Sequence, residues 1–387
     1  MKILFIEWES YGYQDIKGAF VAEGHQLAGF PFQVFGHRGE ELLHDPETED
    51  RLEKTLRKET PDVVFSVDYF PVIAKVCQKE DIRYISYSYD CPHTLLYSTT
   101  IKNSCNTAYV FDRAIYQEFR GMGIDTVHYL PLAADTERLD GAAQGTLEPA
   151  YDVSFVGSLY LEKGNYFDEI EPLLPAYEKG YLKAMIAVQL KLQGYDLVRE
   201  MMAPLLDDLY RVYPVGAMRD SLEPRGHFYE QFMIKRRITA IERLDILSSI
   251  AEKYPVDLFT HIQGLSMPGL REHGLVDYRS EMPLVFKQSK INLNITLRSI
   301  RSGIPLRGFD IMGAGGFLLS NYQADLLELF VPDEDFVYYT SKEELLRKID
   351  YYLRHEEERK AIAKNGHDKI AERHTYRHRV REMLESF

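Results

Sequence analysis

Short apolar runs alternate with amphipathic stretches along the first third of the chain. The runs at 2–8, 62–68 and 83–90 have the length of buried strands, and the stretches between them have helical spacing. Strands separated by helices of about 10–15 residues favour a parallel sheet that is covered on both faces. We therefore expect a Rossmann-like α/β domain over residues 1–140.

A second α/β pattern follows a small-residue segment at 141–149, GAAQGTLEP, which we interpret as a linker. Strand-like runs at the two ends of 150–365 predict a second Rossmann-like domain. Within it, about 168–254 has no strand-like run, so we expect a helical insertion that could also support oligomerisation. The helix at 366–387 is expected to pack back on the first domain. Two such domains would face a cleft, with ligands at the carboxyl ends of their strands.

Charge and composition narrow the class of protein. The 387 residues carry a formal net charge of −14, which argues against a generic nucleic-acid-binding surface. Three cysteines fit neither a disulfide framework nor a CxxC metal site. The N-terminal run is too short for a signal peptide, and no apolar run approaches the roughly 20 residues of a membrane span. We expect a cytoplasmic protein without an integral membrane segment.

The stretch from Ser289 to Leu319 is the strongest candidate for ligand binding. It predicts a strand, a basic loop, a short helix that carries Asp310 and a Gly-Ala-Gly-Gly turn. A carboxylate accepts hydrogen bonds from ribose hydroxyls, and backbone amides and arginines bind phosphates. The expected donor-binding residues here are Asp310, Gly313, Gly315 and Gly316. A βαβ turn without any ligand is the alternative interpretation.

A second candidate is FVGSLYLEKG, which ends a predicted strand. Backbone amides at Gly157 and Ser158 can approach a phosphate closely, and Lys163 can supply charge. Because both candidates lie at strand ends of one domain, we expect a single diphosphate to span them. A plain strand–turn with a solvated lysine remains the alternative.

The order FVGSLYLEKG, SKINLNI, IPLRGFDIMGAGGFLLSNY, DLLELF and FVYYTS resembles the spore maturation protein CgeB type of glycosyltransferase. That type is related to the group-1 glycosyltransferases of the GT-B fold. LFIEWESYGYQDIKGAF and SYSYDCPH resemble the N-terminal half of the same family. The resemblance implies transfer of a sugar from a nucleoside-diphosphate sugar, expected to be a UDP-sugar, to an unidentified glycan, protein or small-molecule acceptor.

By similarity, Asp310 takes the place of the second glutamate in a pair eight residues apart, the carboxylate that holds the ribose. Ser302 occupies the place of the first glutamate, so the usual sugar contact is not carried over. In the phosphate loop, Ser158 replaces the family's arginine, whereas Lys163 is kept. We expect the missing charge to come from one of three nearby arginines, with Arg307 as first choice ahead of Arg298 and Arg301.

These groups predict catalysis without a metal or cofactor. Lys163, Arg307 and the amides of the 313–316 turn can stabilise the negative charge of the departing diphosphate. On the acceptor side, Asp90 or His93, just after a strand, is the expected base that deprotonates the acceptor hydroxyl. Helix capping by Asp90 and a plain loop role for His93 are the alternatives.

Two other functions remain open at this point. A nucleotide-sugar epimerase of the GT-B type would turn over the nucleotide-sugar without an acceptor. A non-catalytic nucleotide-sugar-binding protein would bind UDP and show neither transfer nor hydrolysis.

Overall fold

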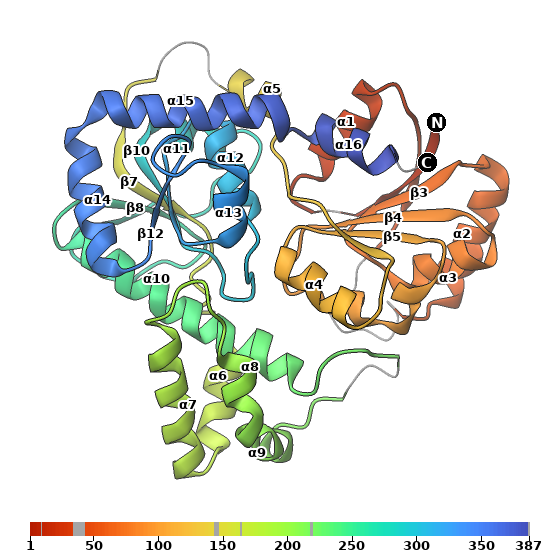
Figure 1. Ribbon diagram of the computed structural model, residues 1–387, viewed down its shortest axis with the longest axis horizontal. Coiled ribbons are helices and arrows are strands. Elements are labelled where there is room, and N and C mark those ends of the chain that lie inside the picture. The colour runs from red at the N-terminus through yellow and green to blue at the C-terminus, as the bar shows by residue number, and fades with distance from the viewer. Residues whose placement is uncertain (9, 34–42, 143–146, 163–164, 217–219, 386–387) are drawn as a thin grey trace. The chain divides into compact units, whose positions relative to one another are not determined.

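The computed structural model describes residues 1–8, 10–33, 43–142, 147–162, 165–216 and 220–385 (Figure 1). The chain divides into two compact units. The first contains 1–134, 216–225 and 374–387, and the second contains 135–215 and 226–373. The chain thus changes units at 134/135 and at 373/374, whereas the sequence pattern placed the corresponding boundaries at 140 and 366.

The first unit contains a parallel sheet of six strands in the order β2-β1-β3-β4-β5-β6. All five residues of β3 are buried, as expected for a central strand covered by helices on both faces. The strands are β1 (Lys2–Glu7), β2 (Gln26–Pro31), β3 (Val63–Val67), β4 (Arg83–Ser88), β5 (Asn106–Val110) and β6 (Val127–Tyr129).

Helices connect these strands, and the sequence explains their ends. The Asp45 carboxylate caps α2 by accepting from the amides of Glu47 and Thr48, and Pro46 occupies the first turn. The helix ends at Thr60, which has a left-handed backbone conformation. The helices are α1 (Tyr13–Ala22), α2 (Pro46–Glu59), α3 (Pro71–Lys79), α4 (Arg113–Gly121) and α16 (Tyr376–Leu384), with short 3₁₀ turns η2 (Thr94–Tyr97) and η3 (Thr99–Lys102).

Two later segments of the chain complete this unit. Helix α16 packs on α1, and Glu23 pairs with Arg377 and Arg381 at 2.6 Å each. From the 216–225 segment, Ser221 forms an antiparallel bridge with Ser98. The first unit is therefore assembled from three separate stretches of sequence.

The second unit contains another six-stranded parallel sheet, in the order β12-β11-β10-β7-β8-β9. Its central pair, β10 and β7, aligns Ile291 with Val153. The strands are β7 (Tyr151–Val156), β8 (Val256–Phe259), β9 (Leu270–Glu272), β10 (Ser289–Asn294), β11 (Leu318–Asn321) and β12 (Val337–Tyr339). The helices next to the sheet are α5 (Thr136–Gly141), α10 (Arg236–Ala251), α11 (Met282–Gln288), α12 (Leu306–Gly313), α13 (Ala324–Leu329), α14 (Lys342–Arg354) and α15 (Glu356–Arg373).

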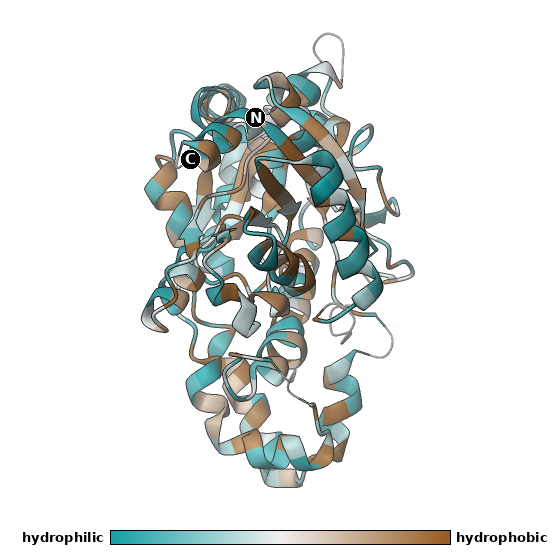
Figure 2. Ribbon diagram, turned by 90° about the vertical axis from the view of Figure 1, so that its right-hand side faces the viewer, coloured by the Kyte–Doolittle hydropathy of each residue, from teal (hydrophilic) through white to brown (hydrophobic). Residues whose placement is uncertain are grey.

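The segment between β7 and β8 is helical, as its sequence indicates. It has its own apolar core, which includes Leu182, Met185 and Met233. Figure 2 shows polar and apolar residues alternating along the helices, the pattern of helices with one buried face. The elements are α6 (Tyr166–Ile170), η4 (Glu171–Leu173), α7 (Ala176–Gln189), α8 (Val198–Met202), η5 (Ala203–Leu205), α9 (Leu206–Val212) and the π-helix η6 (Tyr229–Lys235), which leads into α10.

Among the helices that the structure describes, none combines the length and the apolar character needed to cross a membrane.

Candidate functional site

The carboxyl ends of β7 and β10 lie side by side in the second unit. The two strands are parallel and pair Phe155 with Leu293, so the loops that begin at Gly157 and Ile295 leave the sheet at the same edge. The Gly157 amide donates to the Phe259 carbonyl at 3.0 Å. Its hydrogen is therefore already used by the neighbouring strand β8.

Ser158 organises the loop that follows β7. Its hydroxyl donates to the Glu162 carboxylate at 2.9 Å and accepts from the amide of Tyr160 at 3.1 Å. Tyr160 has a positive φ of 55°, which turns the chain sharply at this point. Lys163, the predicted leaving-group lysine, lies outside the described residues.

A buried arginine from α10 joins the two strand ends. Arg243 donates from Nε to the Ile295 carbonyl at 3.0 Å, and its Nη1 donates to the Ser158 carbonyl. The side chain is 8 % exposed, and burial lowers its pKa, an effect that the Tyr160 and Glu242 groups oppose. Within the described residues, Arg243 donates its hydrogen bonds to backbone carbonyls and forms no ion pair with a carboxylate.

Arg236 lies two turns earlier on the same helix. Its guanidinium is 5.9 Å from the centroid of the Tyr160 ring and 4.9 Å from that of Phe232. Arg243 lies 5.1 Å from the same Tyr160 ring. Within the described part of the chain, Nε of Arg236 is buried without a hydrogen-bond partner. Two guanidinium groups thus lie near the Tyr160 ring, beside the loop that follows β7.

Sequence reasoning missed Arg243 because 85 residues separate it from Ser158. One signal was present, however. Arg243 is in helical phase with the buried Ile246 and Ile250, and an arginine on the apolar face of a helix requires a polar partner.

The three arginines proposed from the sequence have other surroundings. Arg298 forms an ion pair with Glu242 at 2.6 Å and also donates to the Leu192 carbonyl. Arg307 contacts the Met282 sulfur and lies 5.7 Å from the Phe286 ring. Arg301 lines a small hollow together with Arg298 at the ends of β10 and β11. Of these, Arg298 is already neutralised by its carboxylate partner.

Asp310 lies in the middle of α12 and is 1 % exposed. The Tyr278 hydroxyl donates to its carboxylate at 3.2 Å, and the Arg138 guanidinium lies 5.1 Å from the Tyr278 ring. The phenol of Tyr278 occupies one oxygen of this carboxylate. Tyr278 therefore covers the group that the sequence assigns to the ribose.

The glycine turn lies at the opposite edge of the sheet. Gly313 ends α12, and Gly315, with a φ of 75°, precedes β11 at the amino ends of the strands. A Cβ on Gly316 would meet Asn292 at 2.7 Å and the Phe286 carbonyl at 3.1 Å. The structure therefore does not bring these glycines together with Gly157 and Ser158. The amides at the start of α12 lie at the same edge as Ser158 instead.

In the first unit, Asp68 follows β3 and is 1 % exposed. One carboxylate oxygen accepts from the amides of Tyr89 and Asp90 at 2.8 and 3.1 Å. The other is buried and has no hydrogen-bond partner in the described part of the chain. Burial raises the pKa of Asp68 to about 6, although the two amides oppose this shift.

The predicted bases Asp90 and His93 lie beside this carboxylate. Asp90 is exposed and donates its amide to Asp68. Nε2 of His93 is 3.0 Å from both the amide nitrogen and the carbonyl oxygen of Tyr69. Burial lowers the pKa of His93, and the Asp90 charge opposes this shift. The backbone of Tyr69 therefore engages Nε2 of His93.

No group of three or more potential metal ligands occurs among the described residues. Asp333 and Asp335 have the spacing of an acidic metal motif, but they belong to the turn before β12. Asp335 accepts from Lys369 at 2.6 Å and from the Val331 amide at 2.8 Å. These contacts give Asp335 a structural role.

Comparison with protein families gives one match. Residues 231–385 match the family described as "Glycosyl transferase-like". No curated protein matches the sequence.

Comparison with solved structures identifies the fold as GT-B. HepE from Anabaena, solved with UDP and glucose and also with UDP-glucose, aligns over 100 % of both chains with TM-scores of 0.54 at 11 % identity. A glycosyltransferase from Rickettsia africae aligns over 99 % of this chain and 97 % of its own, with a TM-score of 0.53 at 10 % identity. WaaG, a glycosyltransferase of lipopolysaccharide biosynthesis, covers 99 % of both chains with a TM-score of 0.51 at 8 % identity. The chain therefore has the two-domain GT-B architecture, which confirms the predicted fold class.

Proposed function

We propose that this protein is a glycosyltransferase that transfers a sugar from a UDP-sugar to an acceptor hydroxyl. The observation that carries the proposal is the meeting of Arg243 and Arg236 beside Ser158, at the carboxyl ends of β7 and β10. Ligands bind at this edge of open parallel sheets. The partial match to a glycosyltransferase family and the UDP complexes of HepE support the same function.

The donor would bind in the second unit. The backbone amides at the start of α12 and the guanidinium groups of Arg236 and Arg243 bind the diphosphate. Lys163 and Arg307 act on the same diphosphate. Asp310 accepts hydrogen bonds from the ribose hydroxyls once Tyr278 has moved from its carboxylate.

The reaction breaks the bond between the anomeric carbon and the diphosphate oxygen, and the electron pair leaves with UDP. Positive groups close to that oxygen lower the barrier, because negative charge develops on it in the transition state. The acceptor oxygen forms the new bond and gives its proton to a base of the first unit, either Asp90 or His93, with Asp68 beside them. We infer that the reaction needs neither a metal nor a cofactor, that the enzyme belongs to the CgeB-like type, and that it is cytoplasmic.

A donor screen tests this proposal. UDP-sugars should raise the melting temperature of the full chain, because a ligand that binds only the folded state stabilises it. Each stabilising UDP-sugar is then incubated without an acceptor, and release of UDP is followed. Slow hydrolysis to UDP and free sugar is expected. Conversion into an isomeric UDP-sugar, or binding without any UDP release in acceptor screens, would contradict transfer.

A further inference from the structure

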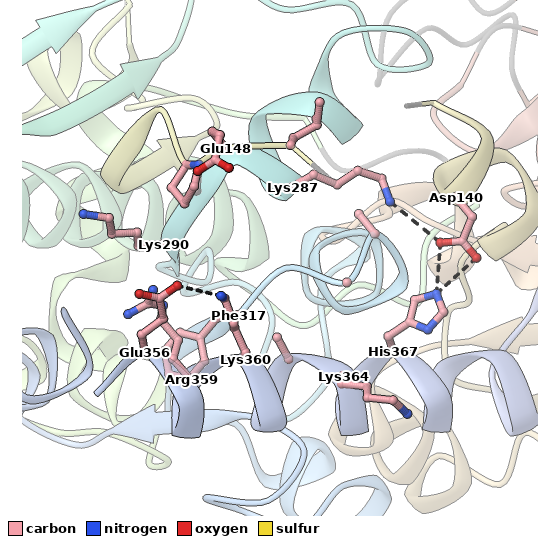
Figure 3. Close-up of a pocket in the computed structure, with 16 residues that line it drawn as sticks. Asp140, Glu148, Lys287, Lys290, Phe317, Glu356, Arg359, Lys360, Lys364 and His367 are labelled. Atoms are coloured by element: carbon pink, nitrogen blue, oxygen red, sulfur yellow. Dashed lines mark hydrogen bonds and ion pairs between the residues drawn. The ribbon is translucent and has the colours of Figure 1, made fainter. Parts of the chain in front are cut away.

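A cavity of about 490 Å³ lies at the amino ends of β7, β10 and β11 (Figure 3). This is the edge of the second sheet opposite to Ser158 and Arg243. Its walls come from α11, α15, the turn after α12 and the segment 147–149. A cavity of this size can hold a small organic ligand. Gly315 lines it, so the glycine turn assigned to the donor from the sequence faces this cavity instead.

The lining is unusually basic for this chain. Five lining side chains carry a full positive charge and three carry a carboxylate, which leaves a local excess of two positive charges in a protein with a net charge of −14. The cations are Lys287, Lys290, Arg359, Lys360 and Lys364, and the carboxylates are Asp140, Glu148 and Glu356.

Arg359 is the buried cation of this lining, and a hydrogen bond to the backbone holds its side chain in place. It is 5 % exposed and donates from Nη1 to the Tyr352 carbonyl at 2.5 Å. Within the described chain, no carboxylate lies within hydrogen-bonding distance of its guanidinium. Arg359 also belongs to the first turn of the 18-residue helix α15, where the partial positive charge of the helix favours an anion.

The lining lysines pair with carboxylates: Lys290 contacts Asp152 at 2.7 Å, and Lys364 contacts Asp368. Lys360 contacts Glu356 at 2.6 Å, but both side chains are more than half exposed. At the other end of the cavity, Lys287 is 3.8 Å from Asp140, and His367 is 3.1 Å from the same carboxylate. The exposed Lys360–Glu356 pair contributes little stability, so a multivalent anion can replace it.

Figure 3 shows Glu356, Arg359, Lys360 and Phe317 gathered at one end of the cavity, and Lys287, Asp140 and His367 at the other. Arg359, Lys360 and Lys290 form one end, and Lys287 and His367 form the other. We propose that the cavity binds a small sugar bisphosphate, with one phosphate at each basic end and the sugar between them. The site is separate from the proposed UDP-sugar site.

Calorimetry with the full chain tests this site. Fructose 1,6-bisphosphate is titrated at low ionic strength, with and without saturating UDP, and inorganic phosphate and anionic phosphatidylglycerol vesicles are titrated in parallel. The bisphosphate should bind at least tenfold more tightly than inorganic phosphate, and UDP should leave its affinity unchanged. The double variant Lys290→Gln/Lys360→Gln and the single variant Lys287→Gln should each weaken binding at least tenfold.

Lys342→Gln is the matched control, because Lys342 pairs with Asp245 elsewhere in the same unit. It should bind the bisphosphate as the unmodified protein does. The proposal is overturned if the bisphosphate does not bind, if the cavity variants bind it as well as the control, if UDP displaces it, or if only the vesicles bind. UDP binding by the same samples reports on the donor site independently.

Discussion

Arg243 donates from Nε to the carbonyl oxygen of Ile295 at 3.0 Å, while another nitrogen of the same guanidinium donates to Ser158. One side chain from α10 therefore fixes the loops after two adjacent strands. It also places a positive charge beside the loop that follows β7.

Replacing Arg243 should affect both stability and binding. Arg243→Met leaves two buried carbonyls without their donor, which costs about 1–3 kcal/mol of unfolding free energy. We also expect the UDP affinity of Arg243→Met to be at least tenfold lower than that of the unmodified protein, and the affinity of Arg243→Lys to lie between the two. Calorimetry and chemical denaturation measure the two effects. Arg347→Met, on the exposed side of α14, is the control, and equal UDP affinity in all variants would refute the phosphate role of Arg243.

The ribose assignment of Asp310 predicts a loss of discrimination. The unmodified protein should bind UDP about tenfold more tightly than 2′-deoxy-UDP, since each hydrogen bond to a charged group contributes roughly 1.5–3 kcal/mol. Asp310→Asn should bind the two nucleotides alike. Tyr278→Phe removes the hydroxyl that occupies the carboxylate and should bind UDP at least as tightly as before. Unchanged UDP affinity in Asp310→Ala would exclude the assignment.

Lys163 should act on the transition state. Lys163→Ala is expected to lower kcat by about 100-fold and to change donor affinity by less than about threefold, because charge on the departing oxygen appears only as the bond breaks. Steady-state kinetics and donor titration separate these effects. Equal losses in both quantities would assign Lys163 to ground-state binding.

The raised pKa of Asp68 predicts a pH-dependent stability. An aspartate with a pKa of about 6 in the folded state contributes stability below pH 4, and this contribution is lost as the pH rises through 6. The Asp68→Asn variant cannot ionise at this position. Its unfolding free energy, relative to that of the unmodified protein, should therefore rise by up to about 3 kcal/mol between pH 4 and pH 8. Denaturation at several pH values measures this gain. Asp50→Asn, on the surface pair with Lys54, should show no such trend.

Lys235 and Glu230 form a buried pair at 2.7 Å, each 1 % exposed. Burial raises the pKa of Glu230, but the charges of Lys235 and Arg199 more than offset this and lower it to about 2. Lys235→Met should destabilise the protein by about 3–5 kcal/mol because a buried carboxylate loses its main partner. Adding Glu230→Gln should restore much of the loss. Lys183→Met, which removes an exposed lysine paired with Glu171, should have little effect in the same denaturation assay.

Local sequence patterns predicted the helices and strands better than they predicted the contacts between them. The apolar runs that became β3 and β7, and the helix that carries Asp310, follow from periodicity and turn residues. The edge of the sheet at which Gly315 lies could not be predicted from these patterns, because it depends on the direction in which α12 crosses the sheet. The role of Arg243 depends on a contact between residues 85 positions apart, and the shifted pKa of Asp68 depends on burial by neighbours from several elements.

The first unit is not a continuous stretch of sequence, and this limits how the protein can be dissected. A fragment that stops at residue 134 would lack α16 and expose the surface of α1 that this helix covers. Removing the whole helical insertion would also delete the strand-like bridge at Ser221. Expression of the first unit alone therefore requires that its three segments be rejoined by new linkers.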